Sequence, residues 1–265
     1  MTQSYDGMVI VVTGASTGLG RAIAVGAAQL GARAVVINYA SSDAEAQTTA
    51  RLVAEAGAEA VLAKGDVGSD EVCRQVAEAA QPFGRIDALF NNAGITRAAA
   101  YSNLDLLSGD DFLDIYRVNV VGPYQMIRAA RALLEASDVA AVVNTSSVAG
   151  VTGGGSSIAY SASKGALNTM TKSLAMALAP KIRVNTICPG FIDSPWFDKV
   201  GAAGARDGLR DHISRTTPLQ VASTPEDIAE GALFFGSRAA RHITGETLVI
   251  DAGLHLGAKP SITPE

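Results

Sequence analysis

The chain has 265 residues and a formal net charge of −5 at pH 7, and 48% of its residues are hydrophobic while 18% are charged. At this length one α/β fold can bury about three quarters of the surface that the unfolded chain exposes, so the chain needs no disulfide or metal for stability. The acidic charge and the lack of clustered Lys and Arg exclude nucleic acid as the default partner, because binding to phosphates needs such clusters.

The first predicted strand, residues 8–13, is an apolar run without polar alternation, as expected for a strand buried on both faces. It leads into a glycine-rich stretch, residues 14–20, and then into a predicted helix over residues 21–30. Such a turn at a helix N-terminus forms an anion site, since free N–H groups and the positive end of the helix dipole face the anion. Because the spacing differs from G-x-G-x-x-G, an ordinary tight turn is the alternative. The candidate cofactor-binding residues here are Gly14, Ser16, Thr17, Gly18, Leu19 and Gly20.

A second strand is predicted over residues 34–38, and the loop after it bears on the choice of cofactor. NAD enzymes usually carry an Asp or Glu there, which binds the ribose hydroxyls. The stretch from residue 38 to residue 42 has no carboxylate, and its two serines can donate to a 2′-phosphate, although it also lacks Arg and Lys. We therefore expect NADP(H) to be preferred, with NAD(H) possible. The residues expected to contact the cofactor are Asn38, Tyr39, Ala40 and Ser41.

Beyond this loop, strands and helices keep alternating along the chain. Helices are predicted over residues 43–56, 69–84, 110–136, 156–178 and 225–236, and strands over residues 60–63, 87–90, 139–145, 182–187 and 247–250. Short apolar strands that alternate with helices indicate parallel βαβ units with right-handed crossovers. The predicted fold class is therefore α/β, a single doubly wound Rossmann-like parallel sheet with helices on both faces and ligands at the carboxyl ends of the strands.

One domain is predicted over residues 1–258. The alternation stops at residues 191–218, which contain Pro195, Trp196 and several glycines and are predicted to be a lid over the substrate. A surface excursion with a short helix is the alternative. Residues 259–265 contain two prolines and are predicted to be a loose C-terminal tail.

The remaining composition bears on location and metal content. Cys73 and Cys188 lie far apart, which fits a reducing compartment, and the three histidines lack the spacing of a zinc site. The first seven residues do not read as a signal peptide, and no apolar run approaches ~18 residues. We expect a cytoplasmic protein with no metal, no membrane and no nucleic acid among its partners.

The pair Tyr160 and Lys164 is the strongest candidate for chemistry. If residues 156–178 are helical, the two side chains lie one turn apart on the same face. An ammonium within ~4–6 Å of a phenol favours the phenolate and should lower its pKa by roughly 1–3 units from about 10. Ser147, at the end of a predicted strand, offers a hydroxyl that can hold a substrate oxygen. These residues predict proton transfer to or from a carbonyl or alcohol, and a surface tyrosine beside a solvated lysine is the alternative.

Taken together, these motifs resemble the short-chain dehydrogenase/reductase family over nearly the whole chain. The family's T-G-x-x-x-G-x-G pattern matches Thr13-Gly14 with Gly18 and Gly20, and its N-N-A-G pattern matches Asn91-Asn92-Ala93-Gly94. Its Y-x-x-x-K pattern matches Tyr160 with Lys164, and its P-G pattern matches Pro189-Gly190. The resemblance implies an oxidoreductase that uses NAD(P)(H) to interconvert a secondary alcohol and a ketone by hydride transfer.

The resemblance also implies a catalytic set, Asn119, Ser147, Tyr160 and Lys164. Tyr160 would be the general acid/base, Lys164 would lower its pKa and bind the nicotinamide ribose, and Ser147 would orient the substrate oxygen. Asn119 would hold a water that links Lys164 to solvent. The further cofactor contacts that it implies are Asp66 and Val67 beside the adenine, Asn92, Ala93 and Gly94 at the floor, the turn Pro189 and Gly190, and Ile192 with Ser194 at the carboxamide.

Alternatives within and outside this enzyme class remain open. One is a reductase of 3-oxoacyl chains on an acidic carrier protein, for which Arg128, Arg131 and Lys172 are the candidate basic residues. Another is a dinucleotide-binding regulator without catalysis, against which the intact catalytic set argues. The pocket walls are expected at residues 95–97, 148–155 and 191–218, where Phe191, Trp196 and Val151 predict an apolar substrate of modest size. Relatives in the family are commonly tetramers, so a homo-oligomer is expected.

Overall fold

The computed structural model describes residues 4–197 and 205–257. The predicted tail at residues 259–265 lies outside the described residues, as does the part of the predicted lid from residue 198 to residue 204.

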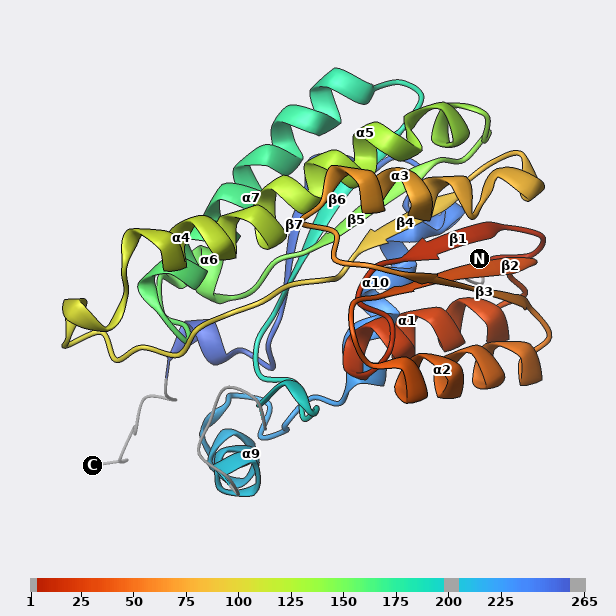
Figure 1. The fold of residues 1–265 in the computed structure, drawn as a ribbon. Helices are drawn as coiled ribbons and strands as arrows, with labels where there is room; N and C mark the ends of the chain where they lie inside the picture. Colours follow the sequence, from red (N-terminus) through yellow and green to blue (C-terminus); the bar gives the residue numbers. More distant parts are fainter. Residues whose placement is uncertain (1–3, 198–204, 258–265) are drawn as a thin grey trace.

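Within the described residues, seven parallel strands form one sheet in the order β3-β2-β1-β4-β5-β6-β7 (Figure 1). The strands are β1 (Val9–Val12), β2 (Ala34–Tyr39), β3 (Glu59–Lys64), β4 (Ala88–Asn91), β5 (Ala141–Thr145), β6 (Arg183–Pro189) and β7 (Thr247–Ile250). Every residue of β1, β2 and β4 is buried, which explains why their sequences are apolar runs rather than alternating patterns. The chain winds outward from β1 in one direction and then from β4 in the other, so the two strands flank the topological switch point, where ligands bind in such sheets.

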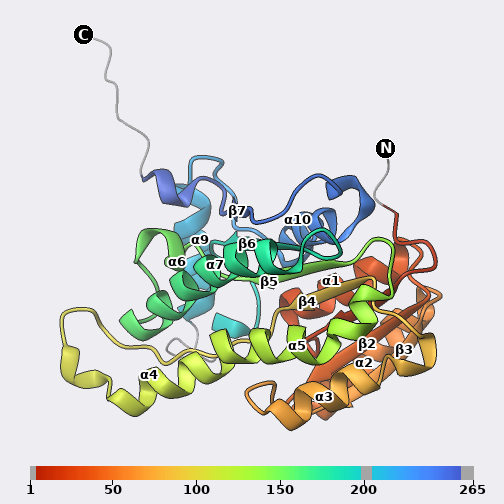
Figure 2. The same ribbon diagram turned by 90° about the horizontal axis from the view of Figure 1, so that it is seen from above.

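The helices cover both faces of the sheet. On one face lie α1 (Gly18–Gln29), α2 (Asp43–Glu55) and α10 (Pro225–Gly236), and on the other lie α3 (Asp70–Glu78), α4 (Gly109–Tyr116), α5 (Gly122–Glu135) and α7 (Ile158–Leu178). Figure 2 shows α3 and α5 side by side along the second face. Alternate residues of β1 divide between the two cores, with Ile10 in the core beneath α1 and α10 and Val11 in the core beneath α3 and α5. The predicted doubly wound fold is confirmed.

Seven further elements lie within the described residues. They are α6 (Ala149–Thr152), α9 (Ala205–Thr216), the 3₁₀ turns η1 (Gln81–Phe83), η2 (Leu104–Leu106), η4 (Arg238–Ala240) and η5 (Leu254–Leu256), and the π-helical turn η3 (Arg117–Val121). Thr224 caps α10 in a capping box with Asp227, which agrees with the predicted start of that helix. No helix in the described part of the chain is long and apolar enough to cross a membrane.

The helix predicted over residues 110–136 is not one regular helix. It divides into α4, the π-helical turn η3 and α5. Gly122 and Pro123 begin α5, where a proline is tolerated because the first N–H groups of a helix have no partner within it. The irregular turn lies just before them and has Asn119 at its centre. Such π-helical turns occur often at functional sites.

Candidate active site

A cavity of about 610 Å³ opens where the carboxyl ends of the strands meet the switch point of the sheet. This volume lies in the range of ligand pockets, ~300–1,000 Å³. Its lining includes nearly all the residues predicted from the sequence, from the glycine turn at one end to Ser147, Tyr160 and Lys164 at the other. Of the predicted catalytic and cofactor-binding residues, only Gly20 and Asn119 do not line it, and both lie behind its walls.

The glycine turn presents unsatisfied donors to the cavity. Thr17, the N-cap of α1, has an extended backbone and makes no side-chain capping bond, and the first turn of α1 carries no acidic residue. Within the described residues, the amide N–H groups of Gly18, Leu19 and Gly20 donate to no acceptor. Gly14 and Gly18 have φ values of +62° and +54°, which favour glycine. A helix N-terminus left open in this way suits a phosphate.

The turn is held in place by Asn92 and Thr13. The Asn92 side-chain amide donates to the carbonyls of Thr13 and Gly14, both at 3.1 Å, while the Thr13 hydroxyl accepts from the amides of Asn92 and Ala93, both at 3.0 Å. Gly20 packs directly against the turn from the other side. Only glycine fits there, because a Cβ at this position would lie 2.3 Å from the Gly14 carbonyl oxygen. Gly20 therefore allows the turn to form without itself facing the cavity.

The end of the cavity at β2 and β3 is where an adenosine is expected. Asn38 lines this end, and its side-chain amide donates at 3.0 Å to the carbonyls of Ala63 and Gly65 and so ties β2 to the end of β3. Burial of Asp66 raises its pKa, but the amide of Gly68 and the guanidinium of Arg117 outweigh this and hold that pKa below its usual range. Asp66 is thus an ionised acceptor at the rim.

Two basic residues lie next to this end that the sequence pattern did not single out. Arg21 donates to the carbonyl of Ser16 at 2.5 Å and to the carboxylate of Glu45 at 2.6 Å. Lys64 lies opposite Tyr39 in the register of β2 and β3, and its amine is 2.8 Å from the Asp43 carboxylate. Cations are therefore present near the loop, and each is paired with a carboxylate of α2. The position of Lys64 beside the loop after β2 follows from the parallel register of β2 and β3. It could not be predicted from the sequence without knowing how these strands pair.

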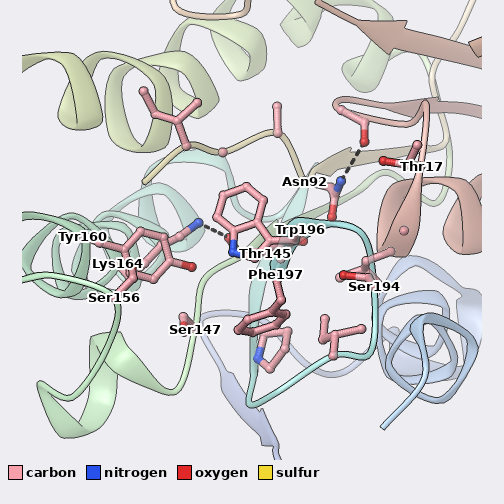
Figure 3. Close-up of a pocket in the computed structure, with 18 of the residues that line it drawn as sticks. Thr17, Asn92, Thr145, Ser147, Ser156, Tyr160, Lys164, Ser194, Trp196 and Phe197 are labelled. Carbon is pink, nitrogen blue, oxygen red and sulfur yellow. Dashed lines mark hydrogen bonds between the residues drawn. The ribbon is translucent and has the colours of Figure 1, made fainter. Parts of the chain in front are cut away.

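The other end of the cavity holds Tyr160, Lys164 and Ser147 (Figure 3). Helix α7 begins after Ser157, whose hydroxyl accepts from the amide of Tyr160 at 3.2 Å. The amine of Lys164 lies 5.6 Å from the centre of the Tyr160 ring and donates to the carbonyl of Thr145 at 2.8 Å. The Lys164 residue is only 3% exposed. The predicted one-turn spacing thus brings phenol and amine together at the end of β5.

The protonation of this pair differs from the expectation. Burial raises the pKa of Tyr160 to about 12, against which the hydrogen bond from Ser147 acts only partly, and burial lowers the pKa of Lys164 from its ordinary 10.5 to about 8. The sequence predicted a net lowering of the Tyr160 pKa, whereas in this structure the effect of burial is larger and the net change is an increase. The amine is directed at the Thr145 carbonyl, and exclusion of solvent disfavours both charged forms.

Asn119 lies at 0% exposure in the π-helical turn η3 and ties the segment after β4 to α7. Its side-chain oxygen accepts from the amide of Ile95 at 2.8 Å, and its side-chain nitrogen donates to the Ile95 carbonyl at 2.9 Å and to the Ser163 hydroxyl at 3.1 Å. The side chain is thus engaged with the protein itself. The water-holding role that the family resemblance implied stays a prediction.

Comparison with known proteins identifies the family. A family model described as enoyl-(acyl carrier protein) reductase matches residues 14–255. A protein of Streptomyces violaceoruber assigned as ketoacyl reductase 2 of the granaticin polyketide synthase is 36% identical over 96% of this chain and 99% of its own. L-rhamnose 1-dehydrogenase (NAD(P)+) of a Sphingomonas species is 34% identical, covering 95% of this chain and 97% of its own. A solved structure from Burkholderia xenovorans, assigned as a short-chain dehydrogenase/reductase, is 40% identical with a TM-score of 0.86, covering 97% of this chain and all of that one (100%).

The chain belongs to the short-chain dehydrogenase/reductase family. As a member of the family it is an NAD(P)-dependent oxidoreductase that interconverts alcohols and ketones, which confirms the function that the sequence motifs implied. The open helix N-terminus and the cavity that runs from it to Tyr160 fit a dinucleotide, so the chain's own residues agree with the cofactor that the family uses.

The substrate side of this short-chain dehydrogenase/reductase is mostly apolar. Phe191, Trp196 and Phe197 line it, and the rings of Trp196 and Tyr160 are 6.5 Å apart. Val151 was expected there but is 51% exposed and does not line the cavity, because it lies on the outer side of the short helix α6. Leu209 and Ile213 of α9 line it within the wall predicted at residues 191–218, whereas Leu254 of η5 was missed by the sequence pattern.

Proposed function

We propose that Tyr160 gives a proton to, or takes one from, the substrate oxygen while Ser147 holds that oxygen in place. The observation that supports this is the placement of both groups, with Lys164, in the cavity whose other end is the open N-terminus of α1. When bound, the nicotinamide cofactor supplies or accepts the hydride. A phenol with a pKa of about 12 keeps its proton at neutral pH, so the resting site is in the protonation state that carbonyl reduction requires.

In this proposal the Lys164 amine gains and loses a proton at a pH only slightly above neutral. With a pKa of about 8, the amine is protonated below that value and neutral above it. Its charged form stabilises a phenolate beside it, so the Lys164 charge favours proton release from Tyr160. The Lys164 amine donates a hydrogen bond to the Thr145 carbonyl at 2.8 Å, and this bond holds the amine next to the Tyr160 ring.

We further propose that NADP(H) is the preferred cofactor. The lining directly after β2 consists of Ala40, Ser41 and Ser42, which offer hydroxyl donors and no carboxylate, while the Asp66 carboxylate lies at the rim after β3. The nearby carboxylate of Asp43 is engaged by the Lys64 amine at 2.8 Å and by the Tyr39 hydroxyl at 3.0 Å. Both partners lower its repulsion of a 2′-phosphate.

For the substrate we propose a small apolar ketone or secondary alcohol. Aromatic residues of the segment after β6 face Tyr160, and the α9 residues Leu209 and Ile213 close the same side. The carrier-bound alternative is less supported, because Arg128 pairs with Asp70, and Arg131 lies 2.7 Å from Glu135. These guanidinium groups are already neutralised on the surface.

The test is the initial rate with NADPH and with NADH over one library of ketones, in which apolar and acidic substrates are matched for size. The proposal expects turnover with NADPH exceeding that with NADH, and apolar ketones exceeding acidic ones. Binding of NADPH with no turnover of any ketone would favour the non-catalytic regulator instead. Faster turnover with NADH would contradict the proposed cofactor preference.

A homotetramer is also proposed. Leu113 on α4 and Val121 on η3 are 69% and 41% exposed, and exposed apolar side chains favour association. Light scattering after size exclusion should give about four times the mass of the 27.1 kDa chain.

The cytoplasmic location stays a prediction, and the two buried, unpaired thiols of Cys73 and Cys188 agree with it.

A further inference from the structure

One wall of the cavity is a glycine loop with little conformational preference of its own. Residues 153–156 read Gly-Gly-Gly-Ser, and Gly154, Gly155 and Ser156 line the cavity beside Tyr160. Consecutive glycines have many accessible backbone conformations, so a defined wall requires contacts from outside the loop. Those contacts come from the segment between β4 and α4.

Tyr101 is the centre of these contacts. Its hydroxyl accepts from the amide of Gly155 at 2.9 Å and donates to the carbonyl of Gly153 at 2.7 Å. The hydroxyl of Ser161, on α7, lies 2.8 Å from it, and the carbonyl oxygen of Ser157 lies 3.3 Å from it. One hydroxyl offers one donor and two acceptor positions, and the three shorter contacts, with Gly153, Gly155 and Ser161, use all of them.

Neighbours of Tyr101 fasten the same loop. The amide of Ala99 donates to the carbonyl of Ser156 at 2.9 Å, and the hydroxyls of Thr96 and Ser156 lie 2.6 Å apart. In Figure 1 this segment, coloured yellow, leaves β4 and passes beside α6 before it reaches α4. Residues 96–101 therefore form a strap over the glycine loop.

The strap matters to the chemistry because Gly155 lies against the proton-transferring side chain. A Cβ built at Gly155 would be 3.4 Å from Cδ1 of Tyr160, 2.8 Å from the hydroxyl of Ser161 and 2.7 Å from Cβ of Ala149. The Gly155 backbone is thus packed between α6 and the Tyr160 ring. A displacement of this glycine changes the width of the cavity next to the phenol.

We propose that Tyr101 is a positioning residue that fixes the glycine loop and thereby sets the fit of the substrate next to Tyr160. This rests on the proposed role of Tyr160. Tyr101 does not itself line the cavity, so it acts through Gly155 and Gly153. Its position is distant from the glycine turn of α1, so the affinity for the cofactor is independent of it.

The test compares the wild type with Tyr101→Phe, which removes the hydroxyl and keeps the ring. The matched control is Tyr124→Phe, since Tyr124 is 47% exposed, similar to the 44% of Tyr101, and lies on α5 away from the loop. For Tyr101→Phe we expect the KM for the ketone to rise about 3- to 10-fold, the factor that corresponds to the net worth of one hydrogen bond. We expect kcat to change less than KM, discrimination between a compact ketone and a bulkier homologue to fall, and the Kd of NADPH to stay unchanged.

A second measurement does not depend on turnover. In the protein without added substrate, hydrogen exchange of the peptide that contains Gly155 should be about tenfold faster or more in Tyr101→Phe and unchanged in Tyr124→Phe. Unchanged exchange together with an unchanged KM would overturn the proposal. If the wild type turns over no ketone, the proposed function fails, while the exchange rates still decide whether Tyr101 fixes the loop.

Discussion

Lys164 is a buried cation whose charge opposes folding. The residue is 3% exposed, and within residues 4–197 and 205–257 its amine has no carboxylate partner at ion-pair distance. Burial lowers its pKa from 10.5 to about 8. The folded state therefore binds this proton more weakly than the unfolded chain does, so the stability of the fold rises as the pH increases from about 8 to about 10.5.

The size of the effect follows from this difference in pKa. At about 1.36 kcal/mol for each pH unit, the penalty at neutral pH is about 3 kcal/mol. Lys164→Met removes the charge and keeps an unbranched side chain, but it also leaves the Thr145 carbonyl without the bond from the amine, a loss of about 1 kcal/mol. We expect the variant to be more stable than the wild type at pH 7 by about 2 kcal/mol.

The assay is urea unfolding at about pH 7 and at about pH 9.5. Both values lie below about pH 10, above which the raised pKa of Tyr160 would make the fold less stable as its phenol ionises in the unfolded chain. The advantage of Lys164→Met should shrink by about 2 kcal/mol between the two pH values, because the wild type loses its penalty as the amine becomes neutral. Lys172→Met, at an exposed position of the same helix, is the control and should show no such dependence. An equal difference at both pH values would refute the reasoning.

Two further substitutions test the cofactor end of the site. Ser41→Asp places a carboxylate in the lining at the adenosine end and should lower the ratio of NADPH to NADH affinity by about 10- to 100-fold in fluorescence titrations. An unchanged ratio would mean that this loop does not face the 2′-phosphate. Gly14→Ala should lower the free energy of unfolding by about 1–3 kcal/mol, because φ is +62° and the new Cβ would lie 2.8 Å from Cα of Ala93. Wild-type stability in urea unfolding would contradict this close packing.

The fold was predictable because its signals are local. Apolar runs such as residues 8–13 predict buried strands, glycines and capping residues predict where helices begin and end, and their alternation predicts a parallel sheet. The carboxyl ends of parallel strands meet at one edge, so the motifs there could be assigned to one cavity before any coordinates. That reasoning placed Tyr160, Lys164 and Ser147 together.

What was not predictable depends on tertiary structure. The π-helical turn around Asn119 has no distinct sequence signal beside Gly122 and Pro123. The pKa of Tyr160 depends on how far solvent is excluded, and spacing along a helix says nothing about that. The pairing of Lys64 with Asp43 depends on strand register. Each of these needs elements that lie far apart in the sequence to be placed together.

The most direct test of the central claim, proton transfer by Tyr160, is the single-turnover rate of NADPH oxidation by a reactive ketone in Tyr160→Phe. A positioned proton donor contributes about 10²–10⁴-fold, so the rate should fall by that factor while the Kd of NADPH stays within about twofold. A variant that keeps the wild-type rate would show that another group supplies the proton.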